Sequence, residues 1–486
     1  MNSRLPRLLS RRLRLAIVLV AAITSSALAA TPALALPPIR HVFIIVLENR
    51  NFDTSFGPGS PAPYLARTLP SQGQLLPQYY GIGHESMDNY DAMISGQGPN
   101  PDTQADCQFY SDVAPGTIGA DGQAAGAGCV YPAPVLTVAN QLEARGLTWR
   151  AYMEDMGNST TEPKVCRHPA LNSQDDTQSA HLGDQYAARH DPFVYFHSII
   201  DNTAGCDANV VPLDRLASDL RSEQSTPNYV FITPNLCHDG HDSPCVDGQP
   251  GGLVSADAFL RQWVPEILQS AAYQDGGLLA VIFDESASGA EACCNEQAAN
   301  TPNAGGPTQG PGGGRVGAVL LSSYIQPGSV NTTPYNHYSL LRSVEDLFGL
   351  SHLGYAGKSD LKGFGGDVFN ATPSAGGPTP TPAPPSGPVS CQSTRVRRGA
   401  RGRLAPGTLI GSSRLARSGN GTLLLQVTMS HAATLRIRVS GLAHTRPIRR
   451  RVRACHTYNI KLPAGTRRVT LVAAFHRARE TRSVSG

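Results

Sequence analysis

Three uninterrupted apolar runs constrain the fold of this 486-residue chain more than any other feature. The runs and the polar residues that end them are 42–47 before Glu48 and Asn49, 229–233 before Pro234 and Asn235, and 278–283 before Asp284 and Glu285. Continuous β-branched and aromatic runs are typical of strands buried on both faces of a parallel sheet. In open α/β sheets, ligands bind at the carboxyl ends of such strands. The pattern therefore predicts a layered α/β domain with a mostly parallel central sheet and a site where these polar residues meet.

Helical patterns between the runs would supply the crossover connections that parallel strands require. We expect helices near residues 135–146, 213–220, 256–272 and 338–347, and further strands at 147–152 and 316–321. The glycine-rich residues 310–314 precede a strand instead of joining a strand to a helix, so they do not match a phosphate-cradling loop. We expect them to form a mobile loop near the mouth of the site.

The net charge of +3 is the average of two opposite regions. Residues 391–486 carry twenty Lys plus Arg and one acid, Glu480, whereas residues 37–390 carry fifteen basic and thirty-six acidic residues. So large an asymmetry predicts separate domains with separate partners. Between the two regions, residues 371–390 contain seven prolines and three glycines, which is typical of an extended linker. The predicted catalytic domain is therefore 36–370.

Residues 1–35 are typical of an export signal, because five arginines precede an apolar run at 15–30 and small-residue cleavage sites follow. No later stretch approaches the ~20 apolar residues of a membrane helix, so none is expected in the mature chain. Ten cysteines, eight before the linker and two after it, favour disulfides in an oxidising compartment over zinc thiolates. Cys391–Cys455 is the simplest pairing after the linker. The protein is expected to be secreted, extracellular or associated with the cell envelope.

The basic tail, residues 391–486, has the pattern of a small all-β domain. Leu435, Ile437 and Val439 alternate with Arg436 and Arg438, which predicts a strand with one apolar and one basic face. Further short strands are expected at 423–427, 449–454 and 469–474. We predict a small antiparallel β-sandwich.

Residues 41–57 read His-Val-Phe-Ile-Ile-Val-Leu-Glu-Asn-Arg-Asn-Phe-Asp-Thr-Ser-Phe-Gly. This segment resembles the opening motif of the phosphoesterase family, approximately Glu-Asn-Arg-Ser-Phe-Asp-x-x-Phe-Gly. The family includes bacterial phospholipases C and secreted acid phosphatases, within the alkaline phosphatase superfamily. The resemblance spans roughly residues 40–350, recurs at five places and does not include the tail. It implies an alkaline-phosphatase-like layered fold for the catalytic domain.

Hydrolysis of a phosphate ester requires neutralisation of charge on the phosphoryl oxygens and an activated nucleophile. A divalent cation held by carboxylates can supply both, and hard oxygen ligands suit such an ion. The resemblance implies that Glu48, Asn49, Asp284 and Glu285 bind one or more divalent metal ions, of identity and number left open. The alternative is that each polar pair only caps a following helix or turn.

The segment Gly-His-Glu-Ser-Met-Asp-Asn-Tyr, which contains Ser86, resembles the family's nucleophile segment. The resemblance implies that Ser86 is the attacking hydroxyl and that Asn89 donates a hydrogen bond to a phosphoryl oxygen. Asp88 stands where the family usually has proline. His84 is a candidate for binding substrate or a second metal. The alternative is that Ser86 only caps the helix predicted from Asp88 onward.

Two further histidine segments resemble family motifs. The first, Asn-Leu-Cys-His-Asp-Gly-His-Asp, begins at Asn235 and is similar to Pro-Asn-x-x-x-Asp-x-His. It implies that Asp239 and His241 bind a second metal, protonate the leaving group or contact phosphate. Asn235 and His238 are candidates for binding substrate or a second metal, and so is His337, in a segment that resembles the last family motif.

The resemblance thus implies a secreted, metal-dependent phosphoesterase of the acid phosphatase type, which hydrolyses phosphate monoesters through a phosphoserine at Ser86. One alternative is a phospholipase C that acts on phospholipid headgroups, although the known phospholipases C of the family are generally longer. Another is an inactive protein that binds the envelope. The basic tail is expected to meet anionic cell-envelope polymers or lipid headgroups. It is not expected to bind nucleic acid by sequence, because it has few aromatic residues and no recognition-helix pattern.

Overall fold

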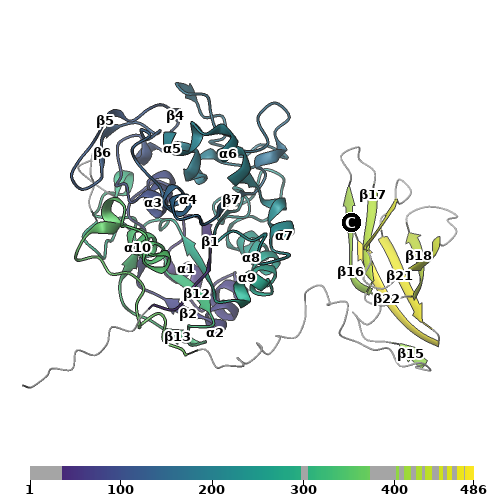
Figure 1. Cartoon of the computed structure of the whole chain (residues 1–486). Helices are drawn as coiled ribbons and strands as arrows, with labels where there is room; N and C mark the ends of the chain where they lie inside the picture. Colours follow the sequence, from purple (N-terminus) through teal and green to yellow (C-terminus); the bar gives the residue numbers. More distant parts are fainter. Residues whose placement is uncertain are drawn as a thin grey trace, which may run out of the picture. The chain divides into compact units, whose positions relative to one another are not determined.

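The chain forms two compact units, Met1–Gly377 and Pro378–Gly486. The structure is a computed structural model that describes residues 36–296 and 305–372, together with the strands of the tail between residues 401 and 485 (Figure 1). The predicted export signal, most of the predicted linker, and Cys391 and Cys455 lie outside the described residues. The two units are therefore described separately.

The first unit is built on an eight-stranded sheet of order β13-β2-β12-β11-β1-β10-β7-β9. Its centre is β1 (His41–Leu47), which pairs in parallel with β10 (Tyr229–Thr233) on one side and β11 (Gly277–Phe283) on the other. Every residue of these three strands is buried. The three apolar runs of the sequence are therefore the central parallel strands, as predicted.

The two edges of this sheet differ in direction. Beyond β10, the strands β7 (Trp149–Met153) and β9 (Val210–Pro212) continue the parallel order. Beyond β11, the strand β12 (Ala318–Ser322) runs antiparallel, followed by β2 (Gln74–Leu76) and β13 (Ser329–Val330). The strand predicted at 316–321 is thus present, and its direction makes the sheet mixed. Three small ladders complete the unit: β3 (Tyr79–Tyr80) with β14 (Tyr335–Asn336), β4 (Phe109–Tyr110) with β8 (Ser173–Gln174), and β5 (Ala114–Ile118) with β6 (Ala124–Ala127).

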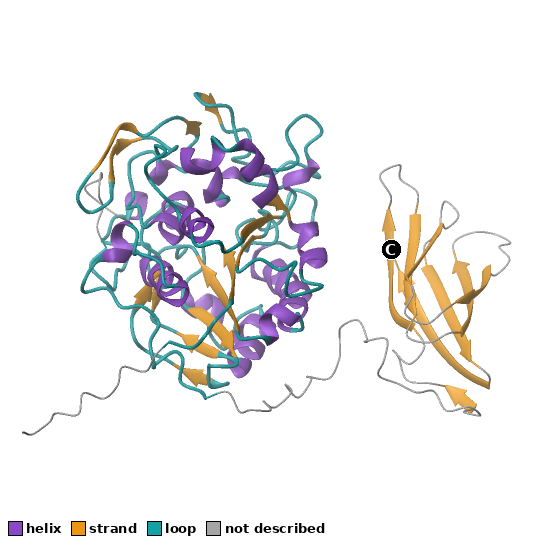
Figure 2. Ribbon diagram, in the orientation of Figure 1, coloured by secondary structure: helices purple, strands orange, loops and turns teal. Residues whose placement is uncertain are grey.

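Helices lie on both sides of the central strands (Figure 2). The longer ones are α3 (Ser86–Ser95), α8 (Gly252–Leu268) and α10 (His337–Phe348). The shorter ones are α1 (Phe52–Phe56), α2 (Leu69–Gln72), α4 (Val138–Ala144), α5 (His197–Ile200), α6 (Thr203–Asn209), α7 (Leu216–Asp219) and α9 (Ala271–Gln274). The helix predicted at 213–220 is only a 3-10 turn followed by α7. Among the described helices, none has the length and apolarity to cross a bilayer.

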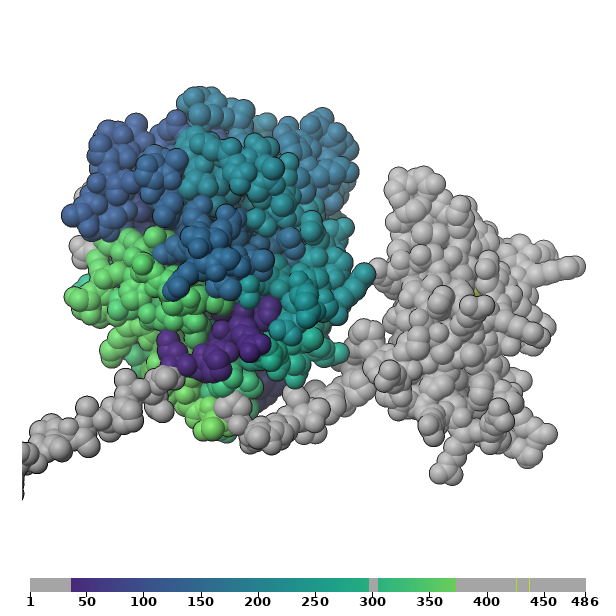
Figure 3. All heavy atoms as spheres, viewed as in Figure 1, coloured from purple at the N-terminus to yellow at the C-terminus, as the bar shows by residue number. Residues whose placement is uncertain are grey.

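Segments far apart in the sequence share one surface of this unit. The space-filling view shows purple residues from the start of the described part of the unit beside green residues from its end (Figure 3). Four disulfides join neighbouring segments, namely Cys107–Cys129, Cys166–Cys206, Cys237–Cys245 and Cys293–Cys294. All eight cysteines before the linker are therefore paired in disulfides, as predicted.

The tail contains two sheets among its described strands. One has the order β15-β22-β21-β18-β19 and the other β16-β17-β20. The bounds are β15 (Arg401–Arg403), β16 (Ile410–Arg417), β17 (Leu423–Met429), β18 (Ala433–Ser440), β19 (Ile448–Val452), β20 (Thr457–Lys461), β21 (Arg468–Phe475) and β22 (Arg477–Ser485). Every pairing is antiparallel except that of β15 with β22. Leu425 and Ile437 are buried, one in each sheet. The predicted all-β character and most predicted strands are confirmed.

Candidate active site

The polar residues at the carboxyl ends of β1 and β11 meet. The last paired residues of these adjacent strands are Leu47 and Phe283, so the residues that follow both strands emerge side by side. The backbone N–H of Asn49 donates to Asp284 Oδ1 at 2.9 Å, and Asn49 Nδ2 donates to Glu285 Oε1 at 3.0 Å and to Glu48 Oε2 at 3.4 Å. The four predicted metal ligands thus form one connected group.

Ser86 touches this group. It is the first residue of α3, and its Oγ donates to Glu48 Oε2 at 2.8 Å. One turn further along α3, Tyr90 Oη donates to the other carboxylate oxygen, Glu48 Oε1, at 2.6 Å. The N-cap position of α3 belongs to Glu85, and no side-chain capping bond is present there. Ser86 therefore does not have the capping role that was its alternative.

The three carboxylates of this group are buried together. Burial raises the pKa values of Glu48, Asp284 and Glu285 well above their usual ranges. The charges of neighbouring carboxylates raise all three pKa values further. Asp284 Oδ2 is buried and accepts no hydrogen bond from the described residues. Buried acidic groups this close are costly as anions unless a cation accompanies them. The oxygen-only donor set and the orphaned carboxylate oxygen fit a hard divalent cation.

The loop after β10 brings a fourth acid to the site. The backbone N–H of Glu48 donates to the carbonyl of Asp239 at 2.9 Å, and Asp239 is itself buried. Asp239 Oδ1 accepts the backbone N–H of His241 at 2.8 Å, while Oδ2 has no hydrogen bond among the described residues. Burial, followed by the charge of Glu48, raises the pKa of Asp239 well above its usual range. Asp239 is therefore an additional candidate for a cation-binding side chain.

His190 was not among the predicted residues, yet it lies between the two acidic groups. Its Nε2 is 3.4 Å from Glu48 Oε1 and its Nδ1 is 3.6 Å from Asp239 Oδ2, while its ring stacks on Tyr90 at 5.2 Å. Burial, and then the charge of Arg189, lowers the pKa of His190 well below its usual range, which favours the neutral imidazole. The sequence signal was Arg-His-Asp-Pro at 189–192, a dense group of polar residues between apolar ones.

His241 stands at the open side of the site. Its side chain is 43% exposed, and Nδ1 lies 2.8 Å from Asp242 Oδ1. The hydrogen bond with Asp242 raises the pKa of His241 above its usual range. The shift favours the protonated imidazole, and the side chain remains accessible to a bound molecule.

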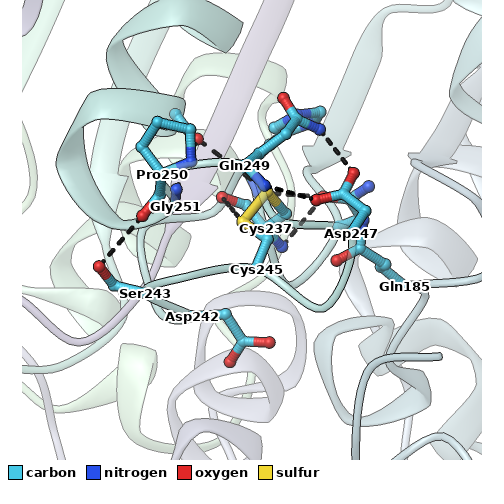
Figure 4. The surroundings of a disulfide bond; sticks show 12 residues. Gln185, Cys237, Asp242, Ser243, Cys245, Asp247, Gln249, Pro250 and Gly251 are labelled. Atoms are coloured by element: carbon cyan, nitrogen blue, oxygen red, sulfur yellow. Dashed lines mark hydrogen bonds between the residues drawn. A yellow bond between two sulfur atoms is a disulfide. The ribbon is translucent and has the colours of Figure 1, made fainter. Parts of the chain in front are cut away.

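The loop that carries Asp239 and His241 is closed by the disulfide Cys237–Cys245, whose two cysteines are buried. Figure 4 shows this disulfide beside Ser243, whose hydroxyl donates to the carbonyl of Pro250 at 3.2 Å. The cross-link restricts the backbone on both sides of the acid and the histidine. This constraint is what a functional side chain on a loop requires.

Asn89 is fully occupied in shaping the loop before Ser86. Its Oδ1 accepts the N–H groups of Ile82 and Gly83 at 2.8 and 3.3 Å, and its Nδ2 donates to the carbonyls of Gly83 and Glu85, both at 3.0 Å. Both N–H groups of the amide are therefore used. This differs from the predicted hydrogen bond to a phosphoryl oxygen, because no amide proton remains for one.

Two of the predicted histidines, His84 and His337, contact the residues that carry the carboxylates. His84 Nδ1 contacts Glu285 Oε2, and its Nε2 lies 2.7 Å from the carbonyl of Gly289. His337 Nε2 contacts the carbonyl of Asp284 at 2.5 Å, and its Nδ1 lies 3.1 Å from Tyr79 Oη. Burial lowers the pKa of His337 to about 4. Both rings thus have partners at both nitrogens. They contact Asp284 and Glu285, the two residues that follow β11.

The other predicted pair, Asn235 and His238, is bound to the end of β7. Asn235 Nδ2 donates to Asp155 Oδ2 at 2.8 Å, and His238 Nδ1 lies 2.9 Å from Glu154 Oε1. No hydrogen bond among the described residues joins either side chain to Glu48 or Asp284. The pair thus organises the neighbouring loop.

The glycine-rich segment 310–314 also borders the site. Gly313 N–H donates to Gly81 O, and its carbonyl accepts from Ser286 N–H. A Cβ at Gly313 would lie 2.3 Å from the carbonyl of Gly83, so only glycine fits between these backbones. The segment is a loop beside the site, but backbone hydrogen bonds join it to the chain on both sides, which differs from the mobile loop that was predicted.

The mixed sheet of this α/β unit thus carries buried carboxylates at the ends of adjacent parallel strands, and one of them, Glu48, accepts a hydrogen bond from the Ser86 hydroxyl. The chain belongs to the phosphoesterase family, whose model matches residues 62–351. The matched range includes Ser86, Asp239, Asp284 and Glu285, and begins after the segment that contains Glu48.

Curated relatives include two fungal proteins. The chain is 25% identical over 318 residues to a probable acid phosphatase of Kluyveromyces lactis and 25% identical over 313 residues to a phosphate-repressible acid phosphatase of Penicillium chrysogenum. These matches cover 65% and 64% of this chain and 59% of either relative, so the chain spans well under two thirds of their length. It is also 24% identical over 344 residues to a phosphatidylinositol-3-phosphatase of Mycobacterium tuberculosis. This match covers 70% of this chain and 88% of that protein.

Similar solved structures include a protein in the alkaline phosphatase superfamily from Vibrio parahaemolyticus, with a TM-score of 0.38 and 13% identity over 69% of this chain and 73% of that one. Another is the lipoteichoic acid synthase LtaP from Listeria monocytogenes, with a TM-score of 0.36 and 12% identity over 68% of this chain and 76% of that one.

Proposed function

We propose that this protein is a metal-dependent phosphoesterase that hydrolyses phosphate monoesters, with Ser86 as its nucleophile. The observation that carries the proposal is the 2.8 Å hydrogen bond from Ser86 Oγ to Glu48 Oε2, inside a group of buried carboxylates. Membership of the phosphoesterase family supports it, as do the names of the fungal relatives, which are acid phosphatases.

Glu48, Asn49, Asp284 and Glu285 would hold a divalent cation. When bound, such an ion neutralises charge on the phosphoryl group and lowers the pKa of a hydroxyl beside it. Glu48 fixes the direction of the Ser86 hydroxyl and is placed to accept its proton. Tyr90 and Asn49 in turn fix the orientation of the Glu48 carboxylate through their hydrogen bonds.

The proposed reaction has two steps. Ser86 Oγ forms a bond to phosphorus as the bond from phosphorus to the ester oxygen breaks, and His241 gives a proton to the leaving alcohol. Water then attacks the phosphoserine and releases inorganic phosphate and the Ser86 hydroxyl. The exposed edge and raised pKa of His241 suit the role of general acid.

A lipid phosphate is a second candidate substrate within the same chemistry. The observation that favours it is the match to the Mycobacterium tuberculosis phosphatidylinositol-3-phosphatase, which covers 88% of that protein. This substrate is also a phosphate monoester, on the headgroup of a lipid. A phospholipase C would instead cleave the diester and release the phosphorylated headgroup.

The decisive experiment compares Ser86→Ala with Ser95→Ala. Both serines are buried in α3, but Ser95 Oγ donates to the backbone carbonyl of Asp91 at 2.6 Å and accepts the N–H of Gln97 at 3.2 Å, and neither partner belongs to the carboxylate group. We expect Ser86→Ala to abolish hydrolysis of nitrophenyl phosphate and Ser95→Ala to preserve it. Acid quenching during turnover should leave phosphate on a peptide that contains Ser86. Undiminished turnover by Ser86→Ala would overturn the mechanism.

The reaction class is tested with two substrates. Hydrolysis of nitrophenyl phosphate without hydrolysis of nitrophenyl phosphocholine is expected. Exclusive cleavage of the choline ester would instead establish a phospholipase C type of activity, and turnover of neither would favour an inactive binding protein.

We also propose that the protein is exported and acts outside the cell or at its envelope. The export-signal pattern of residues 1–35 supports this, and so do the four disulfides, which suit an oxidising compartment. Sequencing the N-terminus of the secreted protein tests the proposal, with cleavage near residue 35 as the expected result.

A further inference from the structure

One face of the five-stranded sheet in the tail collects arginines. In β18, Ile437 is 1% exposed, which identifies the inner face of the sheet, and the alternating residues Arg436 and Arg438 belong to the other face. In the neighbouring strand β19, Arg449 pairs directly with Arg436, and Arg451 pairs with Thr434 two positions away. Residues that pair across strands share a face. Two adjacent strands therefore contribute four arginines to the same side.

The same face continues across the other three strands, which lie side by side in Figure 1. Following the register from β18 through β21 and β22 to β15 adds five more arginines. They are Arg468 of β21, Arg477 and Arg479 of β22, and Arg401 and Arg403 of β15. We call this side of the sheet the arginine face.

The one acid of the tail falls on the opposite face. Glu480 pairs with Ala473, which pairs with Leu435, and Leu435 is on the Ile437 side of β18. Leu471 is on that side too, directly opposite Ile437. Within the described strands, the only charged residues on the arginine face are therefore arginines, whereas the opposite face has Glu480 and, with Leu435, Ile437 and Leu471, most of the larger apolar residues.

Like charges are also placed directly opposite one another. Arg436 pairs with Arg449, and β15 and β22 pair Arg401 with Arg477 and Arg403 with Arg479. Direct cross-strand pairs of like charge destabilise a sheet. An anionic partner would remove this penalty, so the face is arranged for binding and not for the stability of the isolated tail.

The distribution of the arginines indicates a planar partner. Five strands at ~4.8 Å spacing extend about 19 Å, and alternate residues of a strand are about 7 Å apart, so the charges cover an area in two dimensions. A linear polyanion would contact only one row of such an array. Arginine binds phosphate through two N–H groups at once. By register, the described strands place no aromatic residue on this face on which a nucleic-acid base would stack.

We propose that the arginine face docks this protein on the surface of an anionic phospholipid bilayer, through the phosphates of the headgroups. Docking is independent of the proposed catalysis at Ser86, because the two depend on residues of different units.

The test uses the full chain and vesicles of phosphatidylglycerol mixed with phosphatidylcholine, or of phosphatidylcholine alone. The wild-type protein is expected to sediment with the anionic vesicles, to be released by salt, and not to bind the neutral ones. Replacing Arg449 and Arg479 by Gln should weaken binding about 25-fold, from about fivefold for each arginine. Hydrolysis of nitrophenyl phosphate should be unchanged.

The matched control is the pair Arg450→Gln and Arg482→Gln. These residues lie in the same two strands, β19 and β22, but on the Ile437 side of the sheet, and they remove the same charge. The control should lose less than about threefold in affinity. Circular dichroism checks the fold of both variants, and if the control unfolds, Arg414→Gln with Lys461→Gln in the three-stranded sheet replaces it. Equal losses in the arginine-face and control variants would overturn the proposal. Binding to soluble polyphosphate without binding to anionic vesicles would overturn it too, in favour of a linear partner.

Discussion

In the first unit, Glu48, Asp284 and Glu285 are buried, and each has its own hydrogen-bond partners, such as Ser86, whose hydroxyl lies 2.8 Å from Glu48 Oε2. In the tail, the arginines instead repeat at alternate positions of one sheet face, where any two are nearly equivalent. A buried charge acts through one geometry, because water cannot replace a lost partner. Charges on a surface act together, and each contributes little. A single substitution should therefore have a large effect in the first unit and a small one in the tail.

Asp284→Asn should produce the largest effect. Asp284 accepts the N–H of Asn49 and carries the orphaned oxygen Oδ2, so an amide would keep the size of the side chain and lose a charged ligand. We expect loss of bound divalent metal and a fall in kcat of more than about 100-fold, which exceeds the effect of typical outer-shell changes. Metal analysis of the purified variant and assay with nitrophenyl phosphate measure both.

The control for this variant is Asp257→Asn. Asp257 is also buried, but its Oδ1 accepts the backbone N–H groups of Tyr64 and Leu65 outside the site. We expect it to lower the melting temperature and to leave the metal content and kcat per folded molecule unchanged. Retention of metal and turnover by Asp284→Asn would contradict the proposed ligand group.

Tyr90→Phe should have the next largest effect. The change removes the 2.6 Å hydrogen bond to Glu48 Oε1 and keeps the ring that stacks on His190. A ligand that loses its orienting partner typically costs 10–100-fold in metal affinity or activity. We expect kcat to fall by about that factor with little change in KM. Tyr229→Phe is the control, because the buried Tyr229 hydroxyl has no hydrogen bond among the described residues, and it should leave kcat unchanged. Equal kinetics for the two variants would mean that Tyr90 only packs.

The strand framework of the site could be predicted from the sequence because the information is local. Uninterrupted apolar runs specify strands buried on both faces, and β1, β10 and β11 follow the three runs closely. The direction of β12 could not be predicted in this way. Its apolar run suits either direction, and only its antiparallel pairing with β11 shows which one is adopted.

The roles of individual polar residues were harder to predict, because they depend on which partners are already taken. From the sequence, the Asn89 amide could donate a hydrogen bond to an anion. In the structure, both its oxygen and its nitrogen form hydrogen bonds with the backbone of residues 82–85. His190 lies in a 3-10 turn, Ala188–His190, and follows no strand end, so the rule that located Glu48 and Asp284 could not locate it. Its place beside Glu48 depends on contacts across about 140 residues of chain.

Glu345 is a buried acid for which we expect no bound cation, and Glu345→Gln tests its effect on the stability of the fold. Glu345 is fully buried in α10, its Oε1 accepts the N–H of Leu353 at 2.8 Å, and Oε2 has no hydrogen bond among the described residues. Burial raises the pKa of Glu345 to about 9, above that of the unfolded chain, near 4.5. Because the pKa of Glu345 is raised on folding, the folded state binds the proton more tightly than the unfolded chain does. The stability that this proton contributes is complete below pH 4.5 and is lost as the pH rises toward 9.

The expected result is that Glu345→Gln, which cannot ionise, is more stable than the wild type at pH 8 by about 1–2 kcal/mol. The difference should disappear toward pH 4.5. Thermal unfolding across this pH range measures it, and a variant that is less stable than the wild type at pH 8 would show that the carboxylate is stabilised by an unrecognised cation.

A single change on the arginine face should have the smallest effect. Arg438→Gln removes one of many similar charges, at a position that pairs with Thr470 and not with another arginine. We expect affinity for anionic vesicles to fall about fivefold and kcat on nitrophenyl phosphate to stay the same. Arg436→Gln removes the same charge and also relieves the repulsion between Arg436 and Arg449, so it should lower vesicle affinity equally while raising the melting temperature of the tail. A large loss of vesicle binding from either single variant would mean that the face binds through one specific contact, as the buried site does, and the contrast between the two units would fail.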